Sequence, residues 1–142
     1  MMKNLFAVLF VGLMTIGAFA QETKAKIEFK TDVIDYGTIE KGADGKRTFE
    51  FTNTGDAPLV ITNAKSTCGC TVPSWPKEAI LPGESGTIVV KYNTSRLNKI
   101  AKTITVYSNA ETPTVALRIK GMVVDPNKTS VLEKKSKSLI EE

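Results

Sequence analysis

The sequence predicts an all-β fold, an antiparallel β-sandwich of about seven short strands. Apolar residues recur at every second position in successive segments, which is the period of a strand with one buried face. Turn-forming residues separate these segments at short intervals, and no window before Asp125 has a convincing helical period. Because each sheet would have one apolar face, two sheets should stack face to face. Loops this short favour antiparallel neighbours.

The alternation can be followed strand by strand. Ile34 and Tyr36 share one face of the second segment, and Phe49 and Phe51 share one face of the third. The later segments repeat the pattern with isoleucine, valine and leucine. The expected strands are residues 26–29, 33–39 and 46–53, a strand running from Leu59 towards Cys68, and residues 87–92, 103–107 and 114–120.

Turn chemistry explains where each strand stops. Glycine adopts backbone conformations that other residues avoid, proline fixes one dihedral angle, and asparagine and aspartate bond to their own backbone. Such residues gather in the expected turns, which are residues 41–45, 53–58, 81–86, 93–98 and 109–113.

Both ends of the chain lie outside the expected domain. A basic start at Lys3, an apolar run and a final Ala-Phe-Ala are typical of a signal peptide at residues 1–20, cleaved between Ala20 and Gln21. The apolar run is short for a bilayer span, so we expect no membrane span after its removal. Residues 21–124 form the expected domain, exported to the periplasm, the cell surface or the extracellular space. Residues 125–142 form a polar tail, either disordered or a frayed helix, with a docking helix as the alternative.

Composition excludes several functions. Histidine is absent, so a Ser-His-Asp triad, a Cys-His dyad and a histidine-rich zinc site are excluded. The net charge of +4 falls to +3 once Lys3 is removed, and the lysines are scattered, so we expect no nucleic-acid partner. The carboxylates are spread among turns without evident convergence. We therefore expect no enzyme and no cofactor.

Cys68 and Cys70 are the only cysteines. In a regular strand their alpha carbons would lie near the upper limit for a disulfide, so a bridge requires a bend at Gly69. A bridge this short stabilises the fold little and should be comparatively easy to reduce. Four interpretations remain open: a structural pair, bridged or packed as thiols; a soft-metal site suited to Cu(I); a redox-active pair; and part of a partner-binding surface.

Trp75 and Pro76 follow the cysteines. As the only tryptophan, Trp75 either covers the open end of the sandwich core or anchors a partner, with Pro76 beside it. The expected loops at residues 71–79 and 93–98 are the candidate contact surfaces, since loops at one end of a rigid scaffold often carry binding.

Five short motifs carry a family resemblance. They are Asp-Tyr-Gly-Thr-Ile at 35–39, Phe-Glu-Phe-Thr-Asn-Thr-Gly at 49–55, Ser-Thr-Cys-Gly-Cys-Thr at 66–71, Leu-Pro-Gly-Glu-Ser at 81–85 and Ile-Lys-Gly at 119–121. Together they resemble the bacterial family called domain of unknown function 1573, common in exported proteins of Bacteroidetes-type bacteria. That family is similar to immunoglobulin-like sandwiches of the ASH and major-sperm-protein kind. The resemblance implies an immunoglobulin-like sandwich of seven to eight strands and an envelope location, and it implies no activity.

We therefore expect an exported, non-catalytic immunoglobulin-like module of the bacterial cell envelope that binds or scaffolds an unknown protein or envelope component. Sandwiches of this kind bind by a strand edge or by loops at one end. The alternative is a thiol-based protein that handles a soft metal such as copper, or exchanges disulfides, through Cys68 and Cys70.

Overall fold

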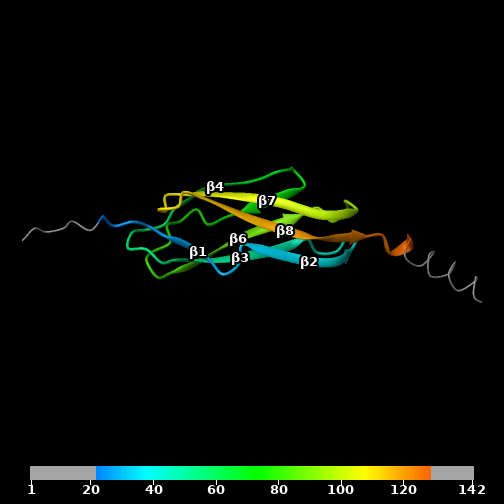
Figure 1. Ribbon diagram of the computed structural model, residues 1–142, viewed down its shortest axis with the longest axis horizontal. Helices are drawn as coiled ribbons and strands as arrows, with labels where there is room; N and C mark the ends of the chain where they lie inside the picture. The colour runs from blue at the N-terminus through cyan, green and yellow to red at the C-terminus, as the bar shows by residue number, and fades with distance from the viewer. Residues whose placement is uncertain (1–21, 129–142) are drawn as a thin grey trace, which may run out of the picture.

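The computed structural model describes residues 22–128, which form two stacked β-sheets (Figure 1). The predicted signal peptide, its cleavage site at Ala20 and Gln21, and most of the predicted tail lie outside these residues. The strands are β1 (Ile27–Phe29), β2 (Val33–Glu40), β3 (Lys46–Asn53), β4 (Ile61–Ser66), β5 (Thr71–Ser74), β6 (Ser85–Tyr92), β7 (Asn98–Ser108) and β8 (Thr114–Val124). A short helical turn at residues 126–128 follows β8. The predicted β-sandwich is confirmed.

The strand order is that of an immunoglobulin constant-type sandwich. The first sheet has the order β1-β3-β6-β5, and the second has the order β2-β8-β7-β4. With β1 as strand A and β3 to β8 as strands B to G, the sheets are ABED and GFC, and β2 is an additional strand beside the last one. The immunoglobulin-like architecture implied by the family resemblance is therefore present.

One strand pair departs from the antiparallel pattern. β2 and β8 run parallel, with Val33 opposite Arg118 and Ile39 opposite Val123. Loop length does not forbid this pair, because the whole of the intervening sandwich connects the two strands. The register of β2 shifts between Asp35 and Thr38, where Gly37 adopts a φ of 65°.

A second difference lies after the cysteines. Residues 71–74, expected as the start of a loop, form the edge strand β5, with Thr71 opposite Tyr92 and Ser74 opposite Val89. Pro73 conceals this strand in the sequence, because proline is accepted only where its missing N–H needs no partner, as at a sheet edge. β7 also begins before residue 103, and β8 continues past residue 120, because the two strands pair with each other along their full lengths.

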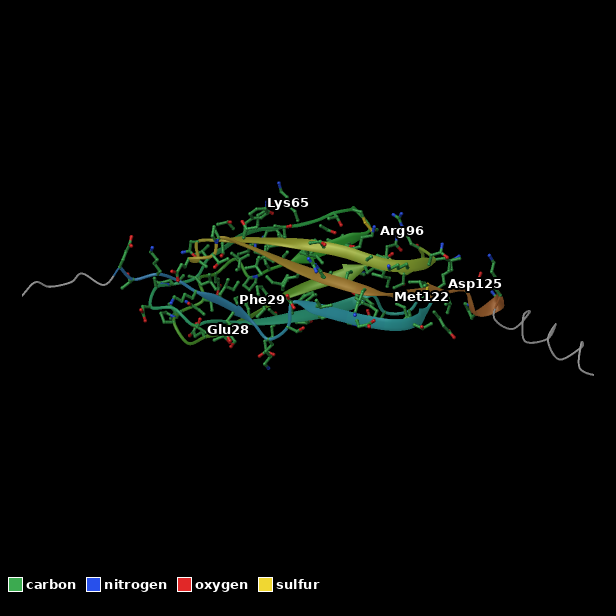
Figure 2. All side chains as sticks on the ribbon, in the orientation of Figure 1. Glu28, Phe29, Lys65, Arg96, Met122 and Asp125 are labelled. Carbon is green, nitrogen blue, oxygen red and sulfur yellow. A yellow bond between two sulfur atoms is a disulfide. The ribbon has the colours of Figure 1, made fainter. Side chains whose placement is uncertain are left out.

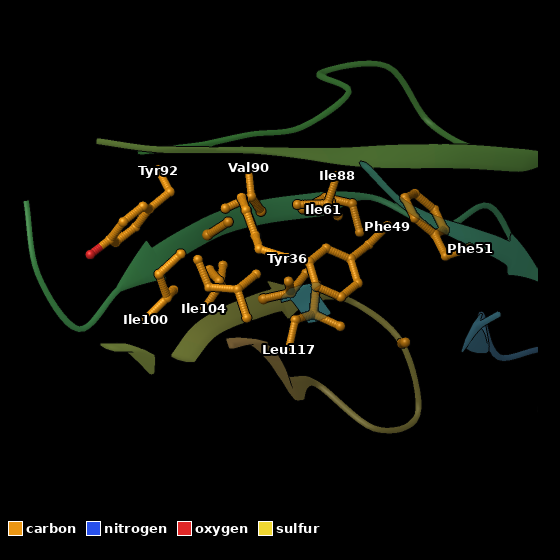
Figure 3. Packing of buried hydrophobic residues seen from close by; sticks show 14 of the residues in the cluster. Tyr36, Phe49, Phe51, Ile61, Ile88, Val90, Tyr92, Ile100, Ile104 and Leu117 are labelled. Atoms are coloured by element: carbon orange, nitrogen blue, oxygen red, sulfur yellow. The ribbon is translucent and has the colours of Figure 1, made fainter. Parts of the chain in front are cut away.

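The core lies between the sheets and is filled by alternate residues of the strands (Figure 3). Phe49 and Ile88 of the first sheet and Leu117 of the second are fully buried. On the outer faces, Lys65 and Glu28 are exposed and point away from the sandwich in opposite directions (Figure 2). The predicted inward residues are thus the observed ones, since a strand has only two faces.

One buried polar side chain ties together the end of the sandwich where β3 stops. Asn53 is fully buried, and its Oδ1 accepts from the N–H groups of Lys26 at 3.3 Å and Gly55 at 3.0 Å. Its Nδ2 donates to the carbonyl oxygens of Ala57 at 2.8 Å and Ile80 at 2.9 Å. All four positions of the amide are therefore used, and they join three separate chain segments.

Tyr36 has the corresponding role at the end where β3 begins. Its hydroxyl donates to the carbonyl oxygen of Gly45 at 2.7 Å, and the Arg47 guanidinium lies 4.2 Å from the centre of its ring. Burial raises the pKa of Tyr36 above its usual value of 10.0; Arg47 opposes this shift, and Asp44 and Tyr92 add to it. Tyr36 thereby fixes the turn at residues 41–45.

Replacing Asn53 should destabilise the fold strongly. We expect Asn53→Ala to lower the free energy of unfolding by about 3 kcal/mol or more, because two N–H groups and two carbonyl groups lose a partner whose own side chain is fully buried. Asn109 is the control, since its side chain also makes two hydrogen bonds to the backbone, at Val60 and Pro58. Asn109 is exposed, so water can take over both bonds when the side chain is removed. Asn109→Ala should cost less than about 1 kcal/mol in urea unfolding. Equal losses for the two variants would contradict this role.

Stability at alkaline pH should depend on Tyr36. Because the folded protein favours the neutral phenol, the contribution of Tyr36 is intact below its unfolded pKa of about 10 and is lost as pH rises through the raised folded pKa. The difference in unfolding free energy between wild type and Tyr36→Phe should therefore shrink above pH 10 in parallel urea titrations. Tyr107→Phe, at an exposed position, should follow the wild type. A difference that is constant with pH would contradict the expectation.

Candidate functional site

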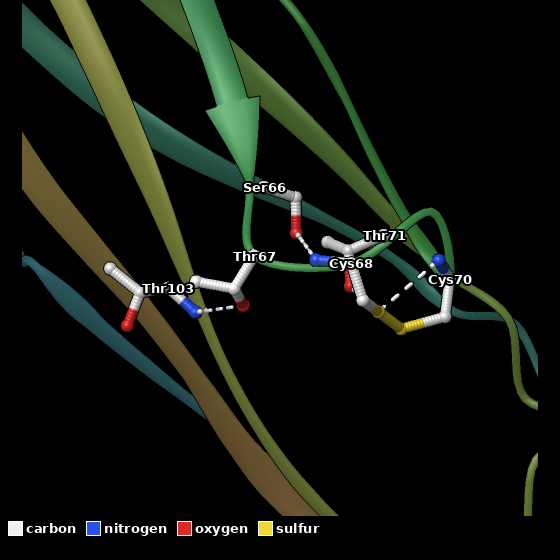
Figure 4. Close-up of a disulfide and its surroundings, with 6 residues drawn as sticks. All are labelled: Ser66, Thr67, Cys68, Cys70, Thr71 and Thr103. Atoms are coloured by element: carbon white, nitrogen blue, oxygen red, sulfur yellow. Dashed lines mark hydrogen bonds between the residues drawn. A yellow bond between two sulfur atoms is a disulfide. The ribbon is translucent and has the colours of Figure 1, made fainter.

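The cysteines lie where the chain crosses from one sheet to the other. β4 is an edge of the second sheet, and β5 is an edge of the first. Before the crossing, the Thr67 N–H donates to the carbonyl oxygen of Thr103 in β7 at 3.1 Å. After it, the Asn93 N–H donates to the carbonyl oxygen of Cys70 at 2.8 Å. The crossing is thus confined to Cys68 and Gly69 (Figure 4).

Cys68 and Cys70 form a disulfide, with alpha carbons 5.3 Å apart. This separation is within the usual range of about 4.4–6.8 Å, because the chain turns at Gly69 instead of continuing as a strand. Apart from its chain neighbours Cys68 and Cys70, a Cβ at Gly69 would meet no atom within 4 Å, so this side of the turn faces open space. The structure therefore contains the bridged form of the pair.

The two sulfurs differ in exposure and in their neighbours. Cys68 is half-buried at the margin of the core, whereas Cys70 is 7% exposed. The backbone N–H of Cys70 donates to Cys68 Sγ at 3.2 Å. The hydroxyl of Thr71, a residue only 3% exposed, lies 3.7 Å from Cys70 Sγ and must be the donor, because a disulfide sulfur has no proton. Each sulfur thus has a hydrogen-bond donor beside it.

Two observations bear on the soft-metal interpretation. Metal binding requires free thiolates, and the bridged sulfurs have none. Within residues 22–128, no group of three or more histidine, cysteine, aspartate or glutamate side chains converges. A metal at this pair would therefore need the bridge to be reduced first.

A groove of about 540 Å³ lies beside the disulfide. This volume is within the range of ligand sites, about 300–1,000 Å³. Val72 is the most exposed large apolar residue of the described chain, at 61%, and the groove also contains one acid, Asp44, and one base, Lys91. Its walls are residues 42–45, Gly69, Cys70, Val72 and residues 91–94.

Hydrogen bonds hold the two sides of this groove together. The Tyr92 N–H donates to the carbonyl oxygen of Gly45 at 3.0 Å, and the Thr94 hydroxyl donates to that of Ala43 at 2.6 Å. A Cβ at Gly45 would collide with the Tyr92 backbone, so this close approach requires glycine. These bonds within the chain therefore set the shape of the groove.

The structure separates the sequence-predicted residues into two places. Val72 from the expected loop 71–79 and Asn93 from the expected loop 93–98 line the same groove as Cys70. Trp75 and Pro76 lie beyond the far end of β5 and do not line it. Trp75 is half-buried against the core, with Lys77 Nζ 3.5 Å from the centre of its ring.

Sequence reasoning missed the contribution of residues 42–45 to the site. The Lys-Gly-Ala-Asp-Gly sequence at 41–45 indicates a turn, but nothing local shows that this turn meets the end of β6. The two glycines so close together were the available signal, since glycine marks close backbone approach.

The edge strands carry local bonds that occupy their own N–H groups. In β2, the Val33 N–H donates to Thr31 Oγ1 at 3.3 Å and the Gly37 N–H to Asp35 Oδ1 at 2.8 Å. In β4, the Ala64 N–H donates to Asn63 Oδ1 at 2.9 Å.

The edge strands of the first sheet, β5 and β1, also offer few free N–H groups to an added strand. In β5, the Thr71 N–H donates to the carbonyl oxygen of Cys68 at 3.3 Å, and Pro73 has no N–H. β1 has only three residues. Occupied donors, proline and short strands all disfavour the addition of another strand.

No helix within residues 22–128 is long and apolar enough to cross a bilayer. No curated protein has a significantly similar sequence.

Solved structures of several other proteins share this fold. A protein of unknown function from Porphyromonas gingivalis W83 is 18% identical with a TM-score of 0.63, over 76% of this chain and 51% of that chain, so this chain spans about half of that one. The ASH/PapD-like domain 7 of human CEP192 is 13% identical with a TM-score of 0.60, over 72% of this chain and 87% of that chain. A chain of the CsuC-CsuE chaperone-tip adhesion subunit pre-assembly complex of Acinetobacter baumannii is 12% identical with a TM-score of 0.50, over 70% of this chain and 57% of that chain.

The family itself is shown by sequence. The model of the family described as "Protein of unknown function (DUF1573)" matches residues 27–123, from the first residue of β1 almost to the end of β8. The match contains the Cys-Gly-Cys turn, the groove and both sheets. The chain therefore belongs to the DUF1573 family.

Proposed function

We propose that this chain is an exported, non-catalytic binding module of the bacterial cell envelope, and that it holds an extended segment of a partner protein in the groove beside Cys70 and Val72. The observation that carries the proposal is this preformed groove at one end of the sandwich. Its walls come from three connections between strands, and hydrogen bonds fix two of them together. A preformed site avoids the cost of ordering loops on binding.

The edges of the sheets also favour the groove as the binding surface. Sandwich domains bind other chains either along a strand edge or with their loops. Here Asp35, Asn63 and Pro73 reduce the N–H groups that β2, β4 and β5 offer to an added strand. Binding at the groove requires no free edge.

An extended polypeptide suits the chemistry of the groove. Val72 offers an apolar contact, and Asp44 and Lys91 offer one charge of each sign. The CsuC-CsuE structure, which has a similar fold, is a complex of a chaperone with an adhesion subunit, and this supports a protein as the partner.

Export and the absence of catalysis rest on the sequence. The basic start, apolar run and Ala-Phe-Ala of residues 1–20 support export to the periplasm or beyond. Histidine is absent from the sequence, and Asp44 is the one carboxylate among the residues that line the groove, so the groove has neither an imidazole base nor a pair of carboxylates.

Site-specific crosslinking in cells tests the groove. A photoreactive amino acid at Gly69 or Val72 should give discrete crosslinked products, because both residues line the groove and a side chain at Gly69 meets no other atom. The controls place the same amino acid at two exposed positions away from the groove. These are Ala116, on the outer face of β8, and Thr62, on the edge strand β4. Crosslinks at Thr62 or Ala116 that equal or exceed those at the groove would reject this binding surface.

Fractionation of cells tests export. The mature protein should be recovered outside the cytoplasm with Gln21 as its first residue, because cleavage follows Ala20. Ala20→Arg should block cleavage and leave a larger product, whereas Glu22→Ala, just beyond the cleavage site, should be processed normally. Full-length wild-type protein in the cytoplasm would contradict the proposed location.

A further inference from the structure

We propose that the Cys68–Cys70 disulfide is a thiol–disulfide exchange site for protein dithiols, in which Cys68 is the sulfur attacked and Cys70 is the leaving group. The proposal goes beyond the binding role and stands independently of whether the groove holds a partner. It is carried by the geometry of the turn, the unequal burial of the two sulfurs and the buried hydroxyl of Thr71.

The bridge is dispensable for the fold. It closes a ring of three residues, so the entropy that it removes from the unfolded chain is small. Backbone bonds secure the chain on both sides of the crossing: Thr67 to Thr103, and Asn93 to Cys70. The Thr71 N–H also donates to the carbonyl oxygen of Cys68 within the turn. None of these bonds requires the sulfurs to be joined, so the sandwich should survive reduction.

Exposure selects the sulfur that is attacked. An incoming thiolate must approach one sulfur along the S–S axis, opposite the bond that breaks. Cys68 is half-buried, while Cys70 is 7% exposed and contacts the core. Gly69 between them presents no side chain and faces open space. The greater exposure of Cys68 as a residue therefore favours attack on its sulfur.

The surroundings of Cys70 suit a leaving group. When the bridge opens, Cys70 Sγ takes the negative charge, and the Thr71 hydroxyl 3.7 Å away can donate to it. Thr71 is only 3% exposed as a residue, and a valine would fill the same volume without burying a polar group. A hydrogen bond to a thiolate stabilises the departing sulfur and accelerates exchange.

The exchange balances without any further reagent. The thiolate of one partner cysteine forms a bond to Cys68 Sγ as the Cys68–Cys70 bond breaks and its electron pair moves to Cys70 Sγ, which then takes up a proton. The second partner thiol, deprotonated, attacks its own partner sulfur in the mixed disulfide and releases Cys68 as a thiolate, stabilised by the Cys70 N–H until it is protonated. The partner dithiol has become a disulfide, and this chain has gained two electrons and two protons.

Trapping with a monothiol tests which sulfur is attacked. Reduced glutathione can form the mixed disulfide but has no second thiol of its own with which to release Cys68. After incubation of the full chain, rapid alkylation and tandem mass spectrometry, at least about nine of ten glutathionylated molecules should have glutathione on Cys68 and the alkyl group on Cys70, an order-of-magnitude preference for the exposed residue. Equal labelling, or a preference for Cys70, overturns the proposal.

A pair of Thr71 variants tests the leaving group. Thr71→Val should slow reduction by dithiothreitol about tenfold, on the scale of one hydrogen bond to a charged group, whereas Thr71→Ser keeps the hydroxyl and should stay within about twofold of wild type. Circular dichroism checks that both variants, and the reduced wild type, remain folded. Wild-type rates for Thr71→Val, equal slowing of both variants, or unfolding on reduction each overturn the proposal.

Discussion

The burial of two apolar sheet faces against each other is the interaction on which the rest of this structure depends. Phe49 and Ile88 face Leu117 across the sandwich, and burying side chains of this size is worth roughly 1.5–3 kcal/mol each. Stacking two sheets also imposes a constraint, since one chain must cross between them. In this protein the crossing from β4 to β5 is a single tight turn, and that turn contains both cysteines.

The two ends of the sandwich are consolidated by different chemistry. At one end the Asn53 amide uses all its hydrogen-bonding positions and is buried, so that end is a structural junction. At the other end Tyr36 and Thr94 hold a turn open to solvent, and a groove remains between this turn and the cysteines. Rigid support beneath an open surface is the usual arrangement of a binding site on a sandwich.

The sequence predicted what depends on local periodicity and missed what depends on pairing. Phe49 and Phe51 could be assigned to the core because a strand alternates its two faces. The parallel pairing of β2 with β8 could not be predicted, since it joins distant segments, and β5 could not, because Pro73 weakens its local signal. For the site, Cys68 and Cys70 were visible by residue type, but their place beside residues 42–45 follows only from the strand order.

Recognition and exchange, as proposed, would share one surface. Cys70 belongs both to the groove wall and to the disulfide, and Gly69 lies at the opening of each. A segment bound in the groove would lie against Cys70, the sulfur partner of Cys68, so opening the bridge would alter one wall of the groove. Because coupling between two sites is reciprocal, each event must change the affinity of the other by the same factor. Gly69 is thus close to both, since it lines the groove and lies between the two bridged cysteines.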